Sequence, residues 1–222
     1  MARVLSINVG QPVPTTVSSA GRTAIGKHPV AGPVAISAPG PRGVGGSGLA
    51  GDAVCDLRHH GGDDQAVYAY AREDLDHFAA ELDRELAPGL FGENLTTAGI
   101  DLGHAVLGET WSLGDGLILR VSVPRIPCRT FAATMGERAW MRRFTAAGRP
   151  GTYLRVLTPG PVSTGDVITV IDRPAHGVTV RVAFSALTTR PELLPALSEV
   201  PNLPAALRSR IARRVSGSGQ AE

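Results

Sequence analysis

The sequence has few aromatic residues, few cysteines, no excess of charge of one sign and no long apolar run. Aromatic residues make up 5% of the 222 residues, and there are only 2 cysteines. The net charge of +2 comes from 22 basic and 20 acidic residues, which is too balanced for the broad basic surface that binds a nucleic acid polymer. No segment approaches the roughly 18 unbroken apolar residues of a membrane span. We therefore expect neither a nucleic acid polymer nor a membrane as a partner.

The first residues, MARVLSINVG, also lack the features of a secretion signal. Their apolar run is shorter than the roughly 7–15 residues that such a signal needs, and no cleavage site follows it. The sequence thus predicts a cytoplasmic protein, in a compartment where thiols stay reduced. Cys55 and Cys128 are expected to be free thiols rather than a disulfide.

Glycine and proline, by contrast, are abundant, with 27 and 17 residues respectively. Such frequent turn residues favour many short strands over a helical bundle. Apolar residues alternate with polar ones from Leu117 to Val123, which is typical of a half-buried strand. The expected strands are 4–9, 23–27, 33–36, 65–70, 117–123, 152–157, 166–171 and 178–184. The sequence therefore predicts a mainly β protein with a closed or nearly closed barrel.

Two segments have helical patterns. Residues 72–86 carry one apolar stripe at helical spacing, and Pro88 and Gly89 end it. Residues 185–215 are rich in leucine and alanine and punctuated by proline, which predicts two or three short helices. The resulting division is a β-barrel domain over 1–184, a helical extension over 185–215 and a disordered tail over 216–222.

Cys128 is the first candidate for chemistry. It follows the strand 117–123 in the segment VPRIPCR, where Pro124 and Pro127 fix the backbone and hold the side chain still. Arg125 and Arg129 flank the cysteine, and their charge favours the thiolate. The alternative is a small buried apolar cysteine, which is what most lone cysteines are.

The segment RHHGGDD (58–64) is the second candidate. Its spacing matches no strong zinc motif, so a polar turn before a strand is one interpretation. Another is an anion-binding or ligand-binding loop, in which Gly61 and Gly62 expose backbone N–H groups and His60 donates a hydrogen bond. A zinc hydrolase built on His59, His60 and Asp64 is a further alternative.

The FGENL segment and Lys27 are further candidates. In FGENL (91–95), Asn94 offers both donors and an acceptor to a heterocyclic amide, and Glu93 is a candidate general acid; the alternative is a turn. Lys27 lies in a loop, where it is either a solvated surface residue or a partner for a phosphate group.

These pieces occur in a recognisable order. IGKHPV (25–30) is followed by GLAGD (48–52), HGG (60–62), FGENL (91–95) and PRIPC (124–128). In this order the chain resembles the MOSC-domain family, the molybdenum cofactor sulfurase C-terminal domain, and in particular its stand-alone bacterial branch. The resemblance covers about residues 1–184 well and the C-terminal segment loosely.

The resemblance implies a barrel-like β domain of the pyruvate-kinase type that binds a pyranopterin molybdenum cofactor. Cys128 matches the cysteine that ligates molybdenum, and a soft thiolate suits that metal. His60, Gly61, Gly62, Glu93 and Asn94 match family segments expected near the pterin and the metal. Lys27 and Arg125 are the expected partners of the cofactor phosphate or the pterin carbonyl.

The leading hypothesis is a molybdenum-dependent reductase of small N-hydroxylated compounds, such as hydroxylaminopurines or amidoximes. Its electrons are expected to come from a separate redox protein, because the chain has no flavin or nicotinamide fingerprint and too few cysteines for an iron–sulfur cluster. Glu93, His60 or water would supply protons. The alternatives are a sulfur-transfer protein that carries a persulfide on Cys128, and a module that binds the cofactor without turnover.

Overall fold

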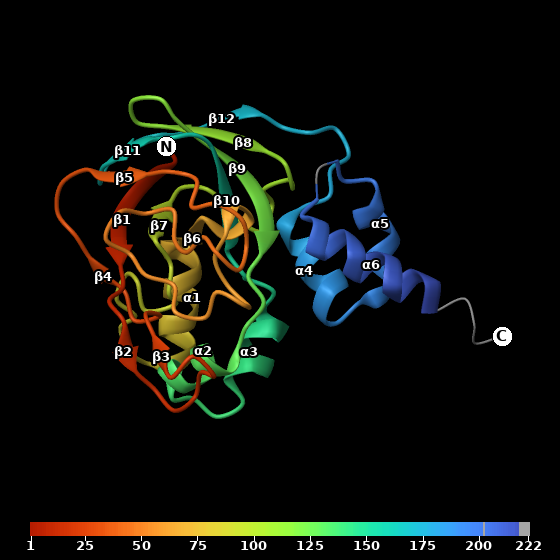
Figure 1. Cartoon of the computed structure of the whole chain (residues 1–222), viewed down its shortest axis with the longest axis horizontal. Helices are drawn as coiled ribbons and strands as arrows, with labels where there is room; N and C mark the ends of the chain where they lie inside the picture. Colours follow the sequence, from red (N-terminus) through yellow and green to blue (C-terminus); the bar gives the residue numbers. More distant parts are fainter. Residues whose placement is uncertain (202, 218–222) are drawn as a thin grey trace.

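The computed structural model describes residues 1–201 and 203–217. An eight-stranded sheet, in the order β12-β8-β9-β10-β6-β7-β1-β4, curves around the centre of the molecule (Figure 1). Within it, β6 and β7 pair in parallel and the other neighbours are antiparallel. The sheet is not closed into a full barrel, but its ends approach where Arg3 bridges Val167. The prediction of a mainly β, barrel-like fold is confirmed.

The strands of the large sheet are short, as the frequent glycines and prolines predict. They are β1 (Arg3–Val9), β4 (His28–Pro29), β6 (Val67–Ala71), β7 (Leu95–Ala98), β8 (Thr110–Leu113), β9 (Leu117–Pro124), β10 (Thr152–Thr158) and β12 (Ile168–Asp172). Two small ribbons complete the β structure. They pair β2 (Val13–Pro14) with β3 (Arg22–Thr23), and β5 (Val34–Ile36) with β11 (Gly160–Val162).

The helices of the described residues form two groups (Figure 1). The first group is α1 (Arg72–Leu82), α2 (Arg129–Met135) and α3 (Trp140–Ala147). The second is α4 (Val180–Thr188), the 3-10 turn η2 (Pro191–Leu193), α5 (Leu194–Ser198) and α6 (Ala205–Gly217). A further 3-10 turn, η1 (Asp63–Gln65), precedes β6. None of these helices has the length and apolar character that crossing a bilayer requires.

Two apolar clusters hold these parts together. The larger one fills the sheet interior and continues into the second helix group, because Leu194, Leu197 and Ile211 belong to it together with strand residues. The smaller one is aromatic and joins β6 to the first helix group through residues such as Phe78, Phe91 and Phe144. Phe91 precedes β7 and packs against Phe131 of α2 at 5.1 Å between ring centroids, so this cluster fixes the segments that carry the candidate site.

Several sequence predictions need correction. The sequence predicts a strand over 178–184, but residues 180–188 form helix α4. The side chain of Thr179 accepts a hydrogen bond from the backbone N–H of Val182 at 3.2 Å and caps that helix. The predicted domain boundary after residue 184 therefore falls inside α4.

Other boundaries also differ. The helix predicted over 72–86 ends at Leu82, because Asp83 adopts a left-handed backbone with φ of 50°. Helices α2 and α3 lie where no helix was predicted. In the predicted disordered tail, Ser216 and Gly217 belong to α6, and 218–222 lie outside the described residues.

Candidate functional site

One cavity brings together most of the predicted site residues. It lies between the N-terminal loops, the loop before η1, the start of β6 and the connection from β9 to α2. The predicted residues that line it are Lys27, His60, Gly61, Asn94, Arg125 and Cys128. Glu93 and Gly62 are not among the lining residues. Thus the sequence motifs, which are up to 103 positions apart (25 to 128), meet at one place.

Cys128 is held at the wall of this cavity by the elements on both sides of it. It precedes α2 directly and has extended backbone angles, with φ of −127° and ψ of 168°. Its carbonyl accepts a hydrogen bond from the backbone N–H of Ala132 at 3.0 Å, so the residue starts the helix. Cys128 is a free cysteine and half-buried, as is Cys55. The prediction of free thiols is confirmed.

The surroundings of the Cys128 sulfur favour its ionised form. Burial by itself raises the pKa of the thiol, but a hydrogen bond with His60 and the charge of Arg125 outweigh it and lower the pKa to about 6. The backbone N–H of Phe131, in the first turn of α2, also donates to the sulfur. A helix N-terminus stabilises a thiolate in this way. Cys128 therefore presents a thiolate to the cavity at neutral pH.

Arg125 is buried and fixed within the aromatic cluster. Its guanidinium donates to the carbonyl of Phe91 and stacks 3.9 Å from the ring centroid of Phe131. Burial disfavours its charge, but the oxygens of Tyr68 and Tyr153 outweigh that effect, and the pKa of Arg125 is raised. The arginine is thus a permanent cation behind the cysteine sulfur.

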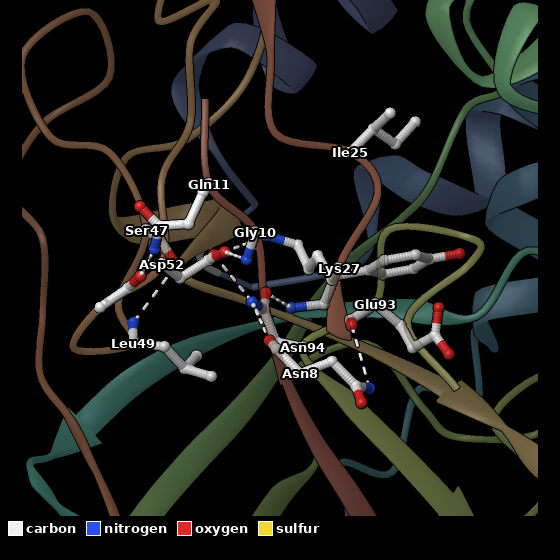
Figure 2. Close-up of polar contacts among 12 residues, drawn as sticks. Asn8, Gly10, Gln11, Ile25, Lys27, Ser47, Leu49, Asp52, Glu93 and Asn94 are labelled. Carbon is white, nitrogen blue, oxygen red and sulfur yellow. Dashed lines mark hydrogen bonds and ion pairs between the residues drawn. The ribbon is translucent and has the colours of Figure 1, made fainter. Parts of the chain in front are cut away.

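Lys27 also reaches the cavity wall, where it forms an ion pair with Asp52 (Figure 2). Both side chains are buried, with 7% and 1% of their surface exposed. Burial lowers the pKa of Lys27, and the charge of Asp52 opposes that shift. The lysine predicted to meet a phosphate therefore already has a carboxylate partner in the protein.

Asp52 also forms hydrogen bonds with residues other than Lys27. Its Oδ1 accepts a hydrogen bond from the backbone N–H of Gly10 at 2.7 Å, and its Oδ2 accepts one from Asn94 Nδ2 at 2.8 Å (Figure 2). Asn94 Oδ1 in turn accepts from the N–H of Tyr68 at 3.1 Å. The amide of Asn94 is thus engaged by the protein itself, and this network joins β1, the 48–52 loop, β6 and the turn before β7.

The structure does not bring Glu93 to the cavity. Its side chain is fully buried, and its carboxylate accepts hydrogen bonds from the N–H groups of Gly89 at 2.6 Å and Phe91 at 3.1 Å, and from the hydroxyl of Thr96 at 3.0 Å. Burial raises the pKa of Glu93, and these hydrogen bonds oppose the shift. Its contacts are those of a group that organises the 89–96 turn.

The two glycines of the HGG segment have different surroundings. Gly61 lines the cavity with φ of 79°, and a Cβ there would lie 2.8 Å from the Gly45 carbonyl oxygen. Gly62, also at φ of 79°, is not among the residues that line the cavity, and a Cβ on it would lie 2.7 Å from the Arg42 backbone. Only glycine fits both positions, because the glycine-rich 39–48 segment packs directly on this loop.

Several cavity residues were missed by the sequence predictions. Asp52 was part of a quoted motif without a role, and Arg22, Gln65, Tyr68 and Tyr153 were not singled out. Gln65 matters most, because its buried Oε1 has no hydrogen-bond partner within the described part of the chain. A buried acceptor left without a donor is costly. No sequence signal identifies these residues, since their positions follow from contacts between distant segments.

The three residues of the alternative zinc site, His59, His60 and Asp64, do not converge on one point. His59 Nδ1 lies 2.9 Å from Asp56 Oδ2, and Asp64 Oδ1 accepts from Arg155 Nε at 3.0 Å. Only His60 of that set lines the cavity. In residues 1–201 and 203–217, no group of three histidine, cysteine or acidic side chains is arranged to hold a metal ion.

Comparison with known proteins places the chain in a family. The MOSC domain matches residues 56–169. Protein YflK of Bacillus subtilis (strain 168), an uncharacterized protein, is 33% identical over 183 residues, which cover 81% of this chain and 78% of YflK. A protein named "Reductase" of Gibberella moniliformis is 31% identical over 185 residues, covering 82% of this chain but only 31% of that protein.

Solved structures agree with this placement. The crystal structure of YiiM from Geobacillus stearothermophilus superposes with a TM-score of 0.77 at 25% identity, covering 97% of this chain and all of YiiM. YiiM of Escherichia coli has the same fold, with a TM-score of 0.73 at 23% identity over 98% of this chain and 94% of that one. From its sequence motifs, its curved sheet and these matches, the chain belongs to the MOSC domain family.

Proposed function

We propose that this protein is a molybdenum-cofactor-dependent reductase of small N-hydroxylated compounds. The observation that carries the proposal is the Cys128 thiolate, which faces a cavity lined by the family motifs and has a pKa of about 6. The match to the MOSC domain and the relative named a reductase support an oxidoreductase.

The residues around the cavity fit a pyranopterin molybdenum cofactor. Cys128 offers a soft thiolate ligand for molybdenum. The unpartnered Oε1 of Gln65 is an acceptor for an N–H group, which the pterin has in its ring amide and amine. Arg22, exposed at the edge of the cavity, donates to the Pro12 carbonyl at 3.1 Å and forms no ion pair with a described residue, so its charge is available to the cofactor phosphate, whereas Lys27 is paired with Asp52.

When bound, the cofactor supplies a redox-active metal that takes the oxygen of an N–OH group. The net reaction consumes two electrons and two protons, breaks the N–O bond and yields the N–H compound and water. The electrons come from a separate redox protein. His60 lines the cavity and hydrogen-bonds the Cys128 sulfur, so it is the residue placed to deliver a proton. Arg125 holds the sulfur in its ionised form, and Tyr68 and Tyr153 shape the wall.

The test uses protein purified from a host with intact molybdenum cofactor synthesis. Bound molybdenum and pterin are measured, and reduction of hydroxylaminopurine and benzamidoxime is followed with a reduced viologen dye as electron donor. The wild-type protein is expected to contain molybdenum and pterin and to reduce at least one of the two substrates. Cys128→Ala is expected to lose molybdenum and activity together.

Cys55→Ala is the matched control, because Cys55 lines the same cavity but burial raises its pKa. This variant should retain both molybdenum and activity. Equal molybdenum and activity in Cys128→Ala and the wild type would overturn the proposal. Bound cofactor without reduction of any N-hydroxylated compound would instead favour a module that only binds it.

A further inference from the structure

A second cavity lies between the sheet and the C-terminal helices. It has a volume of about 540 Å³, within the range of roughly 300–1,000 Å³ that is usual for small-molecule sites. It is bounded by β9, β10, the 172–176 loop and the segment that leads into α6. It shares no lining residue with the Cys128 cavity. The proposed reductase therefore leaves this cavity without a role.

Two arginines face each other across neighbouring strands in this cavity. Arg120 of β9 and Arg155 of β10 are directly opposite in the antiparallel register, and both line the cavity. Like charges in such a pair destabilise a sheet unless an anion lies between or beside them. Arg155 has Asp64, at 3.0 Å, as a partner. Arg120 has no side-chain partner among the described residues.

Helix α6 and the 172–176 loop contribute further hydrogen-bond donors to this cavity. Arg208, in the first turns of α6, lines the cavity and forms no ion pair with any described residue. His176 Nδ1 accepts a hydrogen bond from the Val178 N–H at 3.1 Å, which leaves the ring proton on Nε2. That buried Nε2 has no partner in the described chain. A buried donor without an acceptor is unfavourable, and an anion in the cavity removes that cost.

The remaining lining residues define the rest of the ligand. Pro174, Pro201 and Pro204 give the cavity its accessible apolar surface. Asp172 lies in the same row of the sheet, two strands from Arg120 through Thr110, and has no ion-pair partner among the described residues. A carboxylate only accepts hydrogen bonds, so it suits a hydroxyl or amine of the ligand.

We propose that this cavity is a binding site for a phosphorylated small molecule that carries hydroxyl groups, the chemistry of a mononucleotide. Arg120, Arg208 and the His176 N–H hold the phosphate. The three prolines contact the rest of the ligand, and Asp172 accepts a hydrogen bond from a hydroxyl. Because α6 and the sheet each supply one arginine, a bound phosphate links the helical extension to the sheet.

The test is calorimetric titration with adenosine monophosphate, and with adenosine and inorganic phosphate as separate probes. The wild-type protein is expected to bind the monophosphate more tightly than either part alone. Arg120→Ala and Arg208→Ala should each weaken that binding by at least about tenfold, because each removes a charged hydrogen bond to phosphate. Arg208 is exposed, so its replacement tests the site even if Arg120→Ala fails to fold.

Arg142→Ala is the matched control, since Arg142 is an exposed helical arginine that lines neither cavity. It should bind the monophosphate as the wild type does. Equal affinity in Arg208→Ala and the wild type, or no binding by the wild type at millimolar concentration, would overturn the proposal. Molybdenum content, measured on the same samples, should be unchanged in all three variants, which separates this site from the proposed reductase.

Discussion

At the scale of single residues, the Cys128 sulfur is the group whose chemistry the protein alters most clearly. Its pKa of about 6 places the thiolate form above that pH, whereas burial raises the pKa of Cys55. In metal-free protein we therefore expect iodoacetamide to modify Cys128 before Cys55 at pH 7. The rate should fall as pH drops through about 6, because the thiol replaces the thiolate.

His60, which hydrogen-bonds the Cys128 sulfur, provides a variant that tests the cause of this reactivity. His60→Ala removes the hydrogen bond to the thiolate, so the midpoint of the rate profile should move to higher pH. Mass spectrometry of digested samples assigns the modified cysteine. Equal rates at both cysteines at pH 7 would contradict the lowered pKa of Cys128. A rate profile with the same midpoint in His60→Ala would contradict the stabilisation of the thiolate by His60.

Asp52 gives a second prediction at this scale, concerning stability. Asp52→Ala leaves the buried Lys27 ammonium without its counter-charge and the Gly10 N–H without its acceptor. Removing one partner of a buried ion pair typically costs about 3–5 kcal/mol. Urea unfolding should show a loss of that size, and Asp56→Ala should show much less because, among the described residues, the Asp56 carboxylate bonds only the exposed His59.

A double variant separates the charge effect from general disruption. Lys27→Met combined with Asp52→Ala removes both charges, so it should be more stable than Asp52→Ala alone. If the double variant is as unstable as the sum of the two single losses, the ion pair does not account for the effect.

At the scale of elements, the turn before β7 depends on a buried carboxylate. Glu93 accepts hydrogen bonds from the N–H groups of Gly89 and Phe91, one on each oxygen. In Glu93→Gln the amide NH₂ faces one of these donors, so the free energy of unfolding should fall by about 1–3 kcal/mol. Chemical denaturation measures the loss.

The same variant distinguishes this role from that of a general acid. If Glu93 only holds the turn, folded and cofactor-loaded Glu93→Gln should keep the wild-type pH dependence of turnover. A lost limb of the pH–rate profile with unchanged stability would show that Glu93 takes part in proton transfer, as its sequence position suggests.

The elements also show where sequence reasoning succeeds and where it stops. Alternation over 117–123 predicts β9 correctly, because that strand has one buried and one partly exposed face. The strand predicted over 178–184 does not form: buried Val180, Ala183 and Phe184 follow helical spacing there, and the Thr179 cap starts a helix. Valine favours strands locally, but packing against the sheet decides the outcome.

In the candidate site, too, some residues can be predicted from the sequence and others cannot. Cys128, His60 and Arg125 could be predicted because short motifs carry them. Asp52 could not be given a role, since its partners Gly10, Lys27 and Asn94 are 25 or more positions away in the sequence. Nor could Gln65, because its unpartnered oxygen is a property of the folded cavity. Glu93 was predicted as a candidate acid because it sits in a motif, whereas its burial is a property of the folded turn.

At the scale of the whole molecule, the C-terminal helices share one apolar core with the sheet. Leu197 of α5 is fully buried in the cluster that also contains strand residues such as Leu119 and Leu154. We therefore expect the sheet and the helices to unfold together. Leu197→Ala should lower the stability of both by about 2–5 kcal/mol, the usual cost of such a cavity.

Two probes measured on the same samples test that cooperativity. Helix content by circular dichroism reports on all helices, and tryptophan fluorescence reports on buried Trp111 of β8 and Trp140 of α3. Their urea midpoints should coincide in the wild type and shift together in Leu197→Ala. Leu193→Ala is the matched control with a smaller shift, since Leu193 is only partly buried against the same cluster. Separate midpoints for the two probes would mean that the C-terminal helices form an independent folding unit. If the sheet and these helices share one close-packed core, neither can unfold while the other stays folded.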